Sequence, residues 1–281
     1  YHAKEKSGNC VTYYSTDLSQ RIEEKVQLEQ RLMKALDNDE LEVYIQPQYT
    51  ADGRKMVWGE MLVRWNHKGT FIGPDKFIPL AEETGLIFRV GDFVIERTMA
   101  LLAEHKAAYA ELGIQGVSIN LSARQFYADD LVDSISKKIA KYGIVPTMLD
   151  FELTESMVVD NVQRAIEIMQ DLRTLGCRIS LDDFGTGYSS LSYLQRFPLN
   201  CLKIDRSFID NIQNNKQDLM ISSTIIAMAH HLGLTVVAEG VETQEQADIL
   251  AENGCELLQG YYFDKPMPVS ELVERAVNYT I

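Results

Sequence analysis

Acidic and amide side chains recur in this sequence at the points where short apolar runs end. Asp182 and Asp183 follow one such run, Glu152 lies at the end of another, and Asn120 and Glu239 close two more. One carboxylate in such a place is ordinarily a helix cap or half of a salt bridge, whereas several packed together repel one another at a cost of several kcal/mol. A bound cation removes that repulsion. The sequence therefore predicts a metal cluster, and a ring of unrelated caps and ion pairs is the alternative.

The donor atoms of this set indicate which metal it suits. Glu60 joins the residues above, and all of them offer oxygen, the ligand atom that Mg²⁺ and Mn²⁺ prefer. None of the five histidines lies at the expected end of a parallel strand, which disfavours zinc and non-haem iron. The adjacent Asp182 and Asp183 could serve two ions about 3.5–4 Å apart, as in two-metal phosphoryl enzymes. Lys203 could orient an attacking water or stabilise negative charge, or it could simply compensate charge.

Short apolar runs alternate with helical stretches from residue 41 onward, and this alternation indicates a parallel sheet. An open, doubly wound sheet is the rival of a closed barrel, but the sequence contains no GxGxxG or Walker-type loop. The expected strands are Leu41–Gln48, Val57–Trp65, Gly116–Leu121, Leu149–Leu153, Arg178–Asp182, Cys201–Ile204, Leu234–Ala238 and Leu257–Phe263. The expected helices are Pro74–Leu112 with a break near Gly85, Asp129–Tyr142, Met157–Leu175, Ser207–His231, Thr243–Glu252 and Val269–Tyr279.

The first two expected strands are joined by residues 49–56 alone, with Asp52 and Gly53 as a turn signal. A parallel crossover needs a dozen residues or more, so these two strands must be antiparallel. Eight strands in this length also fit a closed barrel, which is typically about 250 residues long. The expected fold is therefore α/β, a (β/α)8 TIM-like barrel with one antiparallel strand and its active site at the carboxyl ends of the parallel strands.

Composition and charge limit the function classes. The chain has 281 residues, 46% of them hydrophobic, which is ordinary for a globular protein, and a net charge of −14. Such an acidic surface repels nucleic acid, so no nucleic-acid partner is expected, and an anionic substrate would need a local positive charge. No apolar run approaches the roughly 20 residues of a membrane span, so no membrane contact by this segment is expected. The four cysteines are far apart in the sequence, as in a reduced cytoplasmic protein.

Eight short motifs occur in order over about residues 40–268. They are Gln46–Pro47, Glu60–Trp65, Asn120–Ser122, Glu152–Glu155, Asp182–Gly187, Lys203–Asp205, Ala238–Glu242 and Gln259–Gly260. Together they resemble the EAL-domain phosphodiesterases, which hydrolyse the bacterial second messenger cyclic di-GMP to linear 5′-pGpG. The barrel of that family also has one antiparallel strand. Met61, Phe93 and Ile45 depart from its usual residues, but none of these changes removes a charge from the site.

The resemblance implies a role for each site residue. Lys203 would help to position the attacking water, Glu239 is also a candidate base, and Glu155 would hold the loop Asp183–Ser190. The ligands of the first metal would be Glu60, Asn120, Glu152 and Asp182, and those of the second Asp182, Asp183 and Glu239. The residues that would support the site or contact the substrate are Gln46, Leu62, Arg64, Glu242, Gln259, Phe263, Asp264 and Pro268. Within this last set, Phe263 would stack on a base and Asp264 could accept hydrogen bonds from a guanine edge.

The same resemblance implies cofactors, partners and biological context. The expected cofactors are two Mg²⁺ or Mn²⁺ ions per site, with Ca²⁺ inhibitory, because Ca²⁺ prefers longer bonds and more ligands. A homodimer, and a part in biofilm and motility signalling, are also expected. An EAL-family protein that binds cyclic di-GMP without cleaving it is an alternative, and so is a sugar-phosphate enzyme on a similar barrel.

Three segments are expected along the chain. Residues 1–15 resemble the end of an upstream GGDEF-like domain, and residues 16–37 have the periodicity of an amphipathic helix. This helix either packs on its own domain or, as the resemblance implies, is the linker to the upstream domain. Residues 38–281 would form the barrel. The opening without Met indicates a piece of a longer protein, a cytoplasmic part of a chain that could be membrane-anchored elsewhere.

Overall fold

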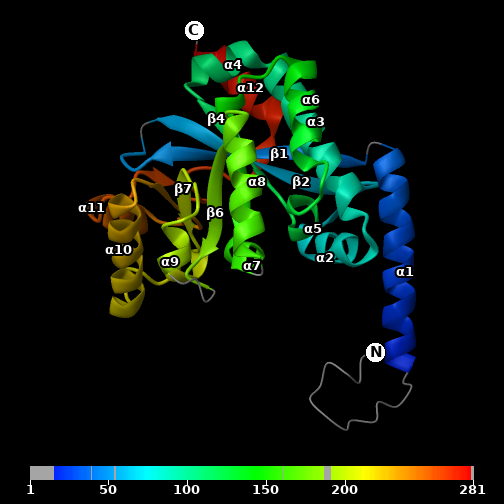
Figure 1. The fold of residues 1–281 in the computed structure, drawn as a ribbon, viewed down its shortest axis with the longest axis horizontal. Coiled ribbons are helices and arrows are strands. Elements are labelled where there is room, and N and C mark those ends of the chain that lie inside the picture. The colour runs from blue at the N-terminus through cyan, green and yellow to red at the C-terminus, as the bar shows by residue number, and fades with distance from the viewer. Residues whose placement is uncertain (1–15, 39, 54, 160, 187–190, 280–281) are drawn as a thin grey trace.

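A closed sheet of eight strands forms the centre of the molecule in a computed structural model that describes residues 16–38, 40–53, 55–159, 161–186 and 191–279 (Figure 1). Each strand is hydrogen-bonded to two neighbours, so the sheet has no free edge within the barrel. This confirms the predicted barrel. Its strands are β1 (Leu41–Thr50), β2 (Met56–His67), β4 (Gly116–Asn120), β5 (Leu149–Thr154), β6 (Arg178–Phe184), β7 (Cys201–Ile204), β8 (Thr235–Ala238) and β9 (Leu257–Leu258).

Strand β1 runs against the rest of the barrel, as predicted. It is antiparallel to β2, where Gln46 pairs with Glu60, and antiparallel to β9, where Tyr49 pairs with Leu258. All the other pairs, from β2 through β4 to β9, are parallel. Two short strands, β3 (Thr70–Ile72) and β10 (Met267–Pro268), extend the sheet beside β2 and β1.

Helices surround the barrel and bury its outer face. Their inward-facing apolar residues join those of the strands in one hydrophobic core that includes Phe77, Met99, Phe151, Met169 and Leu202. The helices are α2 (Pro74–Thr84), α3 (Ile87–Glu104), α4 (Lys106–Leu112), α5 (Ala123–Phe126), α6 (Leu131–Tyr142), α7 (Glu155–Val159), α8 (Val162–Thr174), α9 (Leu191–Leu194), α10 (Lys216–His231), α11 (Gln244–Glu252) and α12 (Val269–Tyr279), with 3₁₀ turns at Pro146–Met148 and Arg206–Phe208.

Several predicted boundaries are wrong for local reasons. The helix expected from Ser207 begins only at Lys216, because the Asn215 side chain accepts a hydrogen bond from the Gln217 amide and caps it there. The strand expected over Leu257–Phe263 has only two residues, and the chain after it turns back toward Val241. The helix expected over Met157–Leu175 is two helices, α7 and α8. The break near Gly85 is confirmed, and a second break lies at His105.

Helix α1 (Thr16–Asp37) precedes the barrel and lies beside α2 (Figure 1, blue). Leu32 and Ala35 are fully buried, whereas Ile22 and Val26 on its first half are about half exposed. The amphipathic helix predicted here is therefore present, and the predicted remnant at residues 1–15 lies outside the described residues. None of the described helices is both long and apolar enough to cross a bilayer.

Candidate active site

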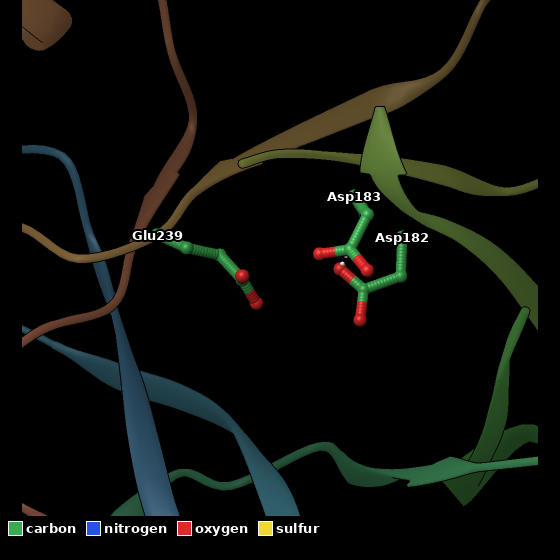
Figure 2. A group of neighbouring side chains, drawn as sticks. All are labelled: Asp182, Asp183 and Glu239. Atoms are coloured by element: carbon green, nitrogen blue, oxygen red, sulfur yellow. Dashed lines mark hydrogen bonds between the residues drawn. The ribbon is translucent and has the colours of Figure 1, made fainter. Parts of the chain in front are cut away.

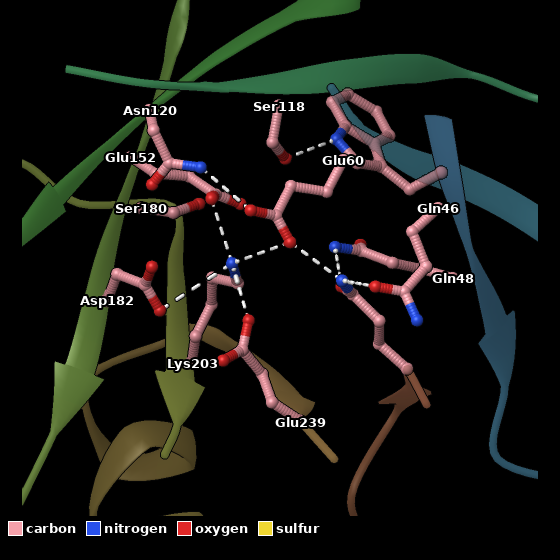
Figure 3. Close-up of polar contacts among 12 residues, drawn as sticks. Gln46, Gln48, Glu60, Ser118, Asn120, Glu152, Ser180, Asp182, Lys203 and Glu239 are labelled. Atoms are coloured by element: carbon pink, nitrogen blue, oxygen red, sulfur yellow. Dashed lines mark hydrogen bonds and ion pairs between the residues drawn. The ribbon is translucent and has the colours of Figure 1, made fainter. Parts of the chain in front are cut away.

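Lys203 lies at the centre of a group of carboxylates at the carboxyl ends of the parallel strands (Figure 3). Its Nζ is 2.6 Å from Glu239 Oε1 and 2.8 Å from Glu152 Oε2, and 3.5 Å from both Glu60 Oε2 and Asp182 Oδ1. These residues come from five different strands or strand ends, so the closure of the barrel brings them together. The side chain of Lys203 is 1% exposed. The predicted grouping of carboxylates is thus present, with the lysine inside it, and the metal that they were predicted to bind stays a prediction.

Side-chain amides fix the position of Glu60. Asn120 Nδ2 donates to its Oε1 at 2.7 Å, and Gln259 Nε2 donates to its Oε2 at 2.6 Å. Gln259 is itself held by two glutamines. Gln48 Nε2 donates to Gln259 Oε1 at 2.8 Å, and Gln259 Nε2 donates to Gln46 Oε1 at 3.2 Å. Because the Asn120 and Gln259 amides donate to both of its oxygens, Glu60 is oriented as an ionised carboxylate.

Asp182 and Asp183 point toward the same space as Glu239 (Figure 2). Carboxylate oxygens of these three residues lie within 4.8 Å of one another. Consecutive strand residues normally face opposite sides of a sheet, but the register of β6 and β7 shifts between Leu181 and Phe184. Asp183 there has φ +54°, in the left-handed region that Asp tolerates better than most residues, and its amide donates to Asp182 Oδ1 at 2.9 Å. This irregularity allows two adjacent carboxylates to serve one site.

Burial and mutual repulsion shift the ionisation of the cluster. Burial raises the pKa of Glu152 well above its usual range and also raises that of Asp182, against the opposing charge of Lys203. The pKa of Glu239 rises to about 8, from burial first, with Asp182 and Glu60 adding repulsion. Burial lowers the pKa of Lys203, but the surrounding carboxylates outweigh it and hold that pKa well above the usual value. The Lys203 ammonium therefore stays charged, and burial and mutual repulsion make the ionised form of most of these carboxylates costly unless a cation is bound.

The donor set fits a hard metal ion. Every side chain of the cluster other than Lys203 offers oxygen, and Glu152 Oε1 is buried without a hydrogen-bond partner among the described residues. A buried acceptor without a donor is costly unless something else satisfies it, and a cation would do so. Glu60, Asn120, Glu152, Asp182, Asp183 and Glu239 are the residues placed to hold such an ion.

Glu155 contacts the loop after β6. It begins α7, it is buried, and its Oε2 accepts a hydrogen bond from the Gly185 amide at 3.2 Å. Thr186 Oγ1 donates to the Asp183 carbonyl at 2.8 Å, which closes a turn in this loop. The predicted contact between Glu155 and a backbone amide of the loop is present, and residues 187–190 lie outside the described part.

The predicted substrate contacts fall into two groups. Gln46, Leu62, Glu242 and Gln259 line a cavity of about 250 Å³ above Glu60, Asp182 and Glu239. Arg64 is on β2, where its guanidinium carbon lies 5.8 Å from the centre of the Tyr44 ring, and Pro268 is on β10, paired with Tyr44.

Phe263 and Asp264 already have partners within the chain. The Phe263 ring stacks on Tyr49, with centroids 5.0 Å apart. Asp264 accepts two hydrogen bonds from Arg275 Nη1, at 2.9 and 3.1 Å, and one from the Tyr49 hydroxyl. Their contacts with a base remain predictions.

The model of the EAL domain matches residues 29–266. The chain belongs to the EAL domain family. The matched segment contains the four carboxylate residues that surround Lys203, which are Glu60, Glu152, Asp182 and Glu239.

Two curated relatives and one solved structure are similar to this EAL chain. It is 40% identical over 276 residues to "Cyclic di-GMP phosphodiesterase NbdA" and 38% identical over 277 residues to "Bifunctional diguanylate cyclase/cyclic di-GMP phosphodiesterase MucR", both of Pseudomonas aeruginosa. These alignments cover 98% and 97% of this chain but 35% and 40% of the relatives, so the chain spans less than half of their length. The structure described as "PaMucR Phosphodiesterase, c-di-GMP complex" has a TM-score of 0.84 and 38% identity, and the match covers 88% of this chain and 99% of that one.

Three residues of the EAL site were missed by sequence reasoning. Gln48 orients Gln259, Arg206 lines the cavity next to Glu239, and Arg275 holds Asp264. Gln48 faces the barrel interior because it is two residues from Gln46 on the same strand, so alternation could have identified it. Arg206 and Arg275 lie outside the strands, and nothing in their spacing relates them to the site.

Proposed function

We propose that this chain is a metal-dependent phosphodiesterase that cleaves one phosphodiester bond of cyclic di-GMP and releases linear 5′-pGpG. The observation that carries this proposal is the contact of Lys203 with four carboxylates below a cavity at the carboxyl end of an EAL barrel. The names of NbdA and MucR, and the substrate in the PaMucR complex, support the same substrate. The activity would lower the concentration of a signal that controls motility and biofilm formation.

The acidic cluster implies a divalent cofactor, and the proposed ions are two Mg²⁺ or Mn²⁺. The proposed ligands are Glu60, Asn120, Glu152 and Asp182 for one ion, and Asp182, Asp183 and Glu239 for the other. When bound, such ions neutralise charge on the phosphodiester and activate water. We expect Ca²⁺ to support little or no turnover, because it prefers longer bonds and more ligands.

The chain's own side chains would prepare the reaction. Lys203 keeps the carboxylates together without losing its proton, and its charge beside them would help to position the attacking water. Glu239 is the candidate base: burial raises its pKa to about 8, so once a bound cation has displaced its proton its carboxylate can take a proton from that water. Glu60 is locked by two amides, so its oxygens keep one orientation during the reaction.

The wider assembly is also proposed. The name of MucR supports an upstream diguanylate cyclase-like domain, with α1 as the link to the barrel. A homodimer through the surface near Asp183–Ser190 is our further expectation. The proposed compartment is the cytoplasm, where thiols such as the buried Cys177, Cys201 and Cys255 stay reduced.

Incubation of the purified chain with cyclic di-GMP and Mg²⁺, with products separated by chromatography, tests this function. We expect pGpG to accumulate, to stop in excess chelator and to fall sharply in Glu60→Ala. Glu256→Gln is the matched control, since Glu256 precedes β9 at the opposite end of the barrel and contacts His230 and the Val236 amide. Tight binding without product would instead indicate a receptor, and turnover in excess chelator would contradict the metal dependence.

A further inference from the structure

Gln48 lies below the carboxylate cluster, on the side toward the amino ends of the parallel strands. It is 2% exposed, and with Glu152 and Lys203 it lines a second cavity, of about 320 Å³, on that side. Gln46 and Gln259 line the cavity on the opposite side, above the cluster. Gln48 thus faces away from the space that would hold a substrate, and its effect on the reaction has to pass through another side chain.

The side chain of Gln259 has to cross β1 to reach Glu60. Gln259 directly follows β9, Glu60 is on β2, and β1 lies between these two strands in the sheet. Gln46 and Gln48 are two residues apart on β1, so both point into the barrel where this crossing takes place (Figure 3). Both of them are hydrogen-bonded to the Gln259 amide. The inward face of β1 therefore supports the contact between Gln259 and Glu60.

Groups that can only accept fix the direction of these hydrogen bonds. The Asp264 carbonyl accepts from Gln46 Nε2 at 3.1 Å, which leaves Gln46 Oε1 to accept from Gln259 Nε2 at 3.2 Å. The same Gln259 Nε2 donates its other hydrogen to Glu60 Oε2 at 2.6 Å. Gln259 Oε1 is then the free end of this amide, and Gln48 Nε2 donates to it at 2.8 Å.

The hydrogen bond from Gln48 keeps the Gln259 amide in this orientation. If the amide were turned by 180°, its carbonyl oxygen would face Glu60 Oε2 and Gln46 Oε1, and three acceptors would meet without a hydrogen between them. Without a donor at position 48, Gln259 Oε1 would lack this partner in a place where the residue is only 4% exposed, which is unfavourable. Either change would weaken the donor to Glu60 Oε2, and the Glu60 carboxylate could then rotate about its last bond.

We propose that Gln48 is a positioning residue for Glu60, because its hydrogen bond to Gln259 holds the plane in which Glu60 would present its oxygens to a divalent cation. This inference rests on the proposed function, in which Glu60 is a metal ligand. Loss of a hydrogen-bonding partner behind a metal ligand typically lowers metal affinity or activity about 10-fold to 100-fold. We expect an effect of this size from Gln48 on metal binding and on kcat, with KM for cyclic di-GMP unchanged.

Binding of Mn²⁺ without substrate, followed by the EPR signal of the free ion, tests this role apart from turnover. Gln48→Met keeps the length of the side chain and removes the donor, so it should raise Kd for Mn²⁺ about 10-fold to 100-fold. Gln48→Glu, studied at pH 8, places an acceptor opposite Gln259 Oε1, and its effect should be at least as large. Thr50→Val is the matched control, since Thr50 is on the same strand and lines the same cavity but contacts Asp52 and Lys55 in the turn.

A double-mutant cycle tests whether Gln48 acts through Gln259. Gln259→Met removes both the acceptor for Gln48 and the donor to Glu60, so adding Gln48→Met to it should change Kd for Mn²⁺ less than about two-fold. Losses that multiply would show that Gln48 acts independently of Gln259, and would overturn the proposal.

Two further results would also overturn it. One is parental Mn²⁺ affinity in both Gln48→Met and Gln48→Glu. The other is a raised KM for cyclic di-GMP at parental Mn²⁺ affinity, which would place Gln48 among the substrate contacts. In each of these outcomes the parent still binds Mn²⁺ and cleaves cyclic di-GMP, whereas failure of the proposed function would be seen in the parent itself.

Discussion

The ammonium of Lys203 lies 2.8 Å from Glu152 Oε2, although the strands that carry these two residues are separated by β6. Lys203 is on β7 and Glu152 on β5, and both side chains are 1% exposed. A buried carboxylate at this place needs compensation, and the lysine supplies one positive charge for at least four negative groups. The site is thus preassembled by one cation of its own, and the remaining negative charge is what further cations would neutralise.

Asp182→Asn should abolish turnover while the barrel stays folded. Asp182 belongs to both proposed ligand sets, and burial together with repulsion from Glu60 raises its pKa. Removing its charge relieves that repulsion, so the melting temperature in chelator should stay the same or rise slightly. We would measure pGpG formation and thermal unfolding in parallel. An activity near that of the parent would show that the metal cluster has been placed wrongly.

Lys203→Met should have the opposite effect on stability. Four carboxylates would lose their buried counter-charge, and removing one partner of a buried ion pair costs about 3–5 kcal/mol. Urea unfolding in chelator should show this loss, and saturating Mg²⁺ should restore part of it by binding the folded state. Lys137→Met is a suitable control, because Lys137 pairs with Asp133 on an exposed helix surface. Equal stability of Lys203→Met and the parent without metal would mean that the carboxylates are neutralised in another way.

Sequence reasoning predicted the cluster better than its details. The strand ends could be located from apolar runs, and barrel closure then forces Glu60, Glu152 and Glu239 together whatever their exact register. The joint use of Asp182 and Asp183 depends on a local bulge, which alternation along a strand argues against. Arg206 was missed because its position follows from the turn at Arg206–Phe208, which replaces the start of the helix expected from Ser207. Local irregularities of this kind are set by tertiary packing.

Magnesium affinity should increase with pH between about 6 and 8. Glu239 has a pKa of about 8 in the metal-free site, raised first by burial, so a cation must displace its proton. The folded-state pKa lies above the ordinary 4.5, so the proton contributes stability that is complete below pH 4.5 and is lost as the pH rises to 8. In chelator, the melting temperature should therefore fall as the pH rises from 4.5 to 8. Glu239→Gln should flatten both the melting profile and the dependence of Mg²⁺ affinity on pH, and unchanged slopes would count against Glu239 as the titrating group.

Glu155 should affect the reaction through the loop that it holds. Glu155 follows Glu152 by three residues but begins a helix, and its Oε2 accepts a hydrogen bond from the Gly185 amide. The loop that it holds begins at Asp183, so the position of the loop sets where that carboxylate is presented. Glu155→Ala should therefore lower turnover strongly by weakening occupancy of the second metal, and raising the Mg²⁺ concentration should restore part of the rate.

Glu152→Ala provides the comparison, because it removes an oxygen ligand at the centre of the cluster. Its loss of turnover should resist added Mg²⁺ much more than that of Glu155→Ala, since no loop movement can replace the missing ligand. We would titrate Mg²⁺ against the initial rate for both variants and for Glu155→Gln, which keeps an oxygen acceptor for the Gly185 amide. Glu155→Gln should lie between the parent and Glu155→Ala. Identical Mg²⁺ curves for Glu155→Ala and Glu152→Ala would refute the role of Glu155 as a loop anchor and would place it among the metal ligands.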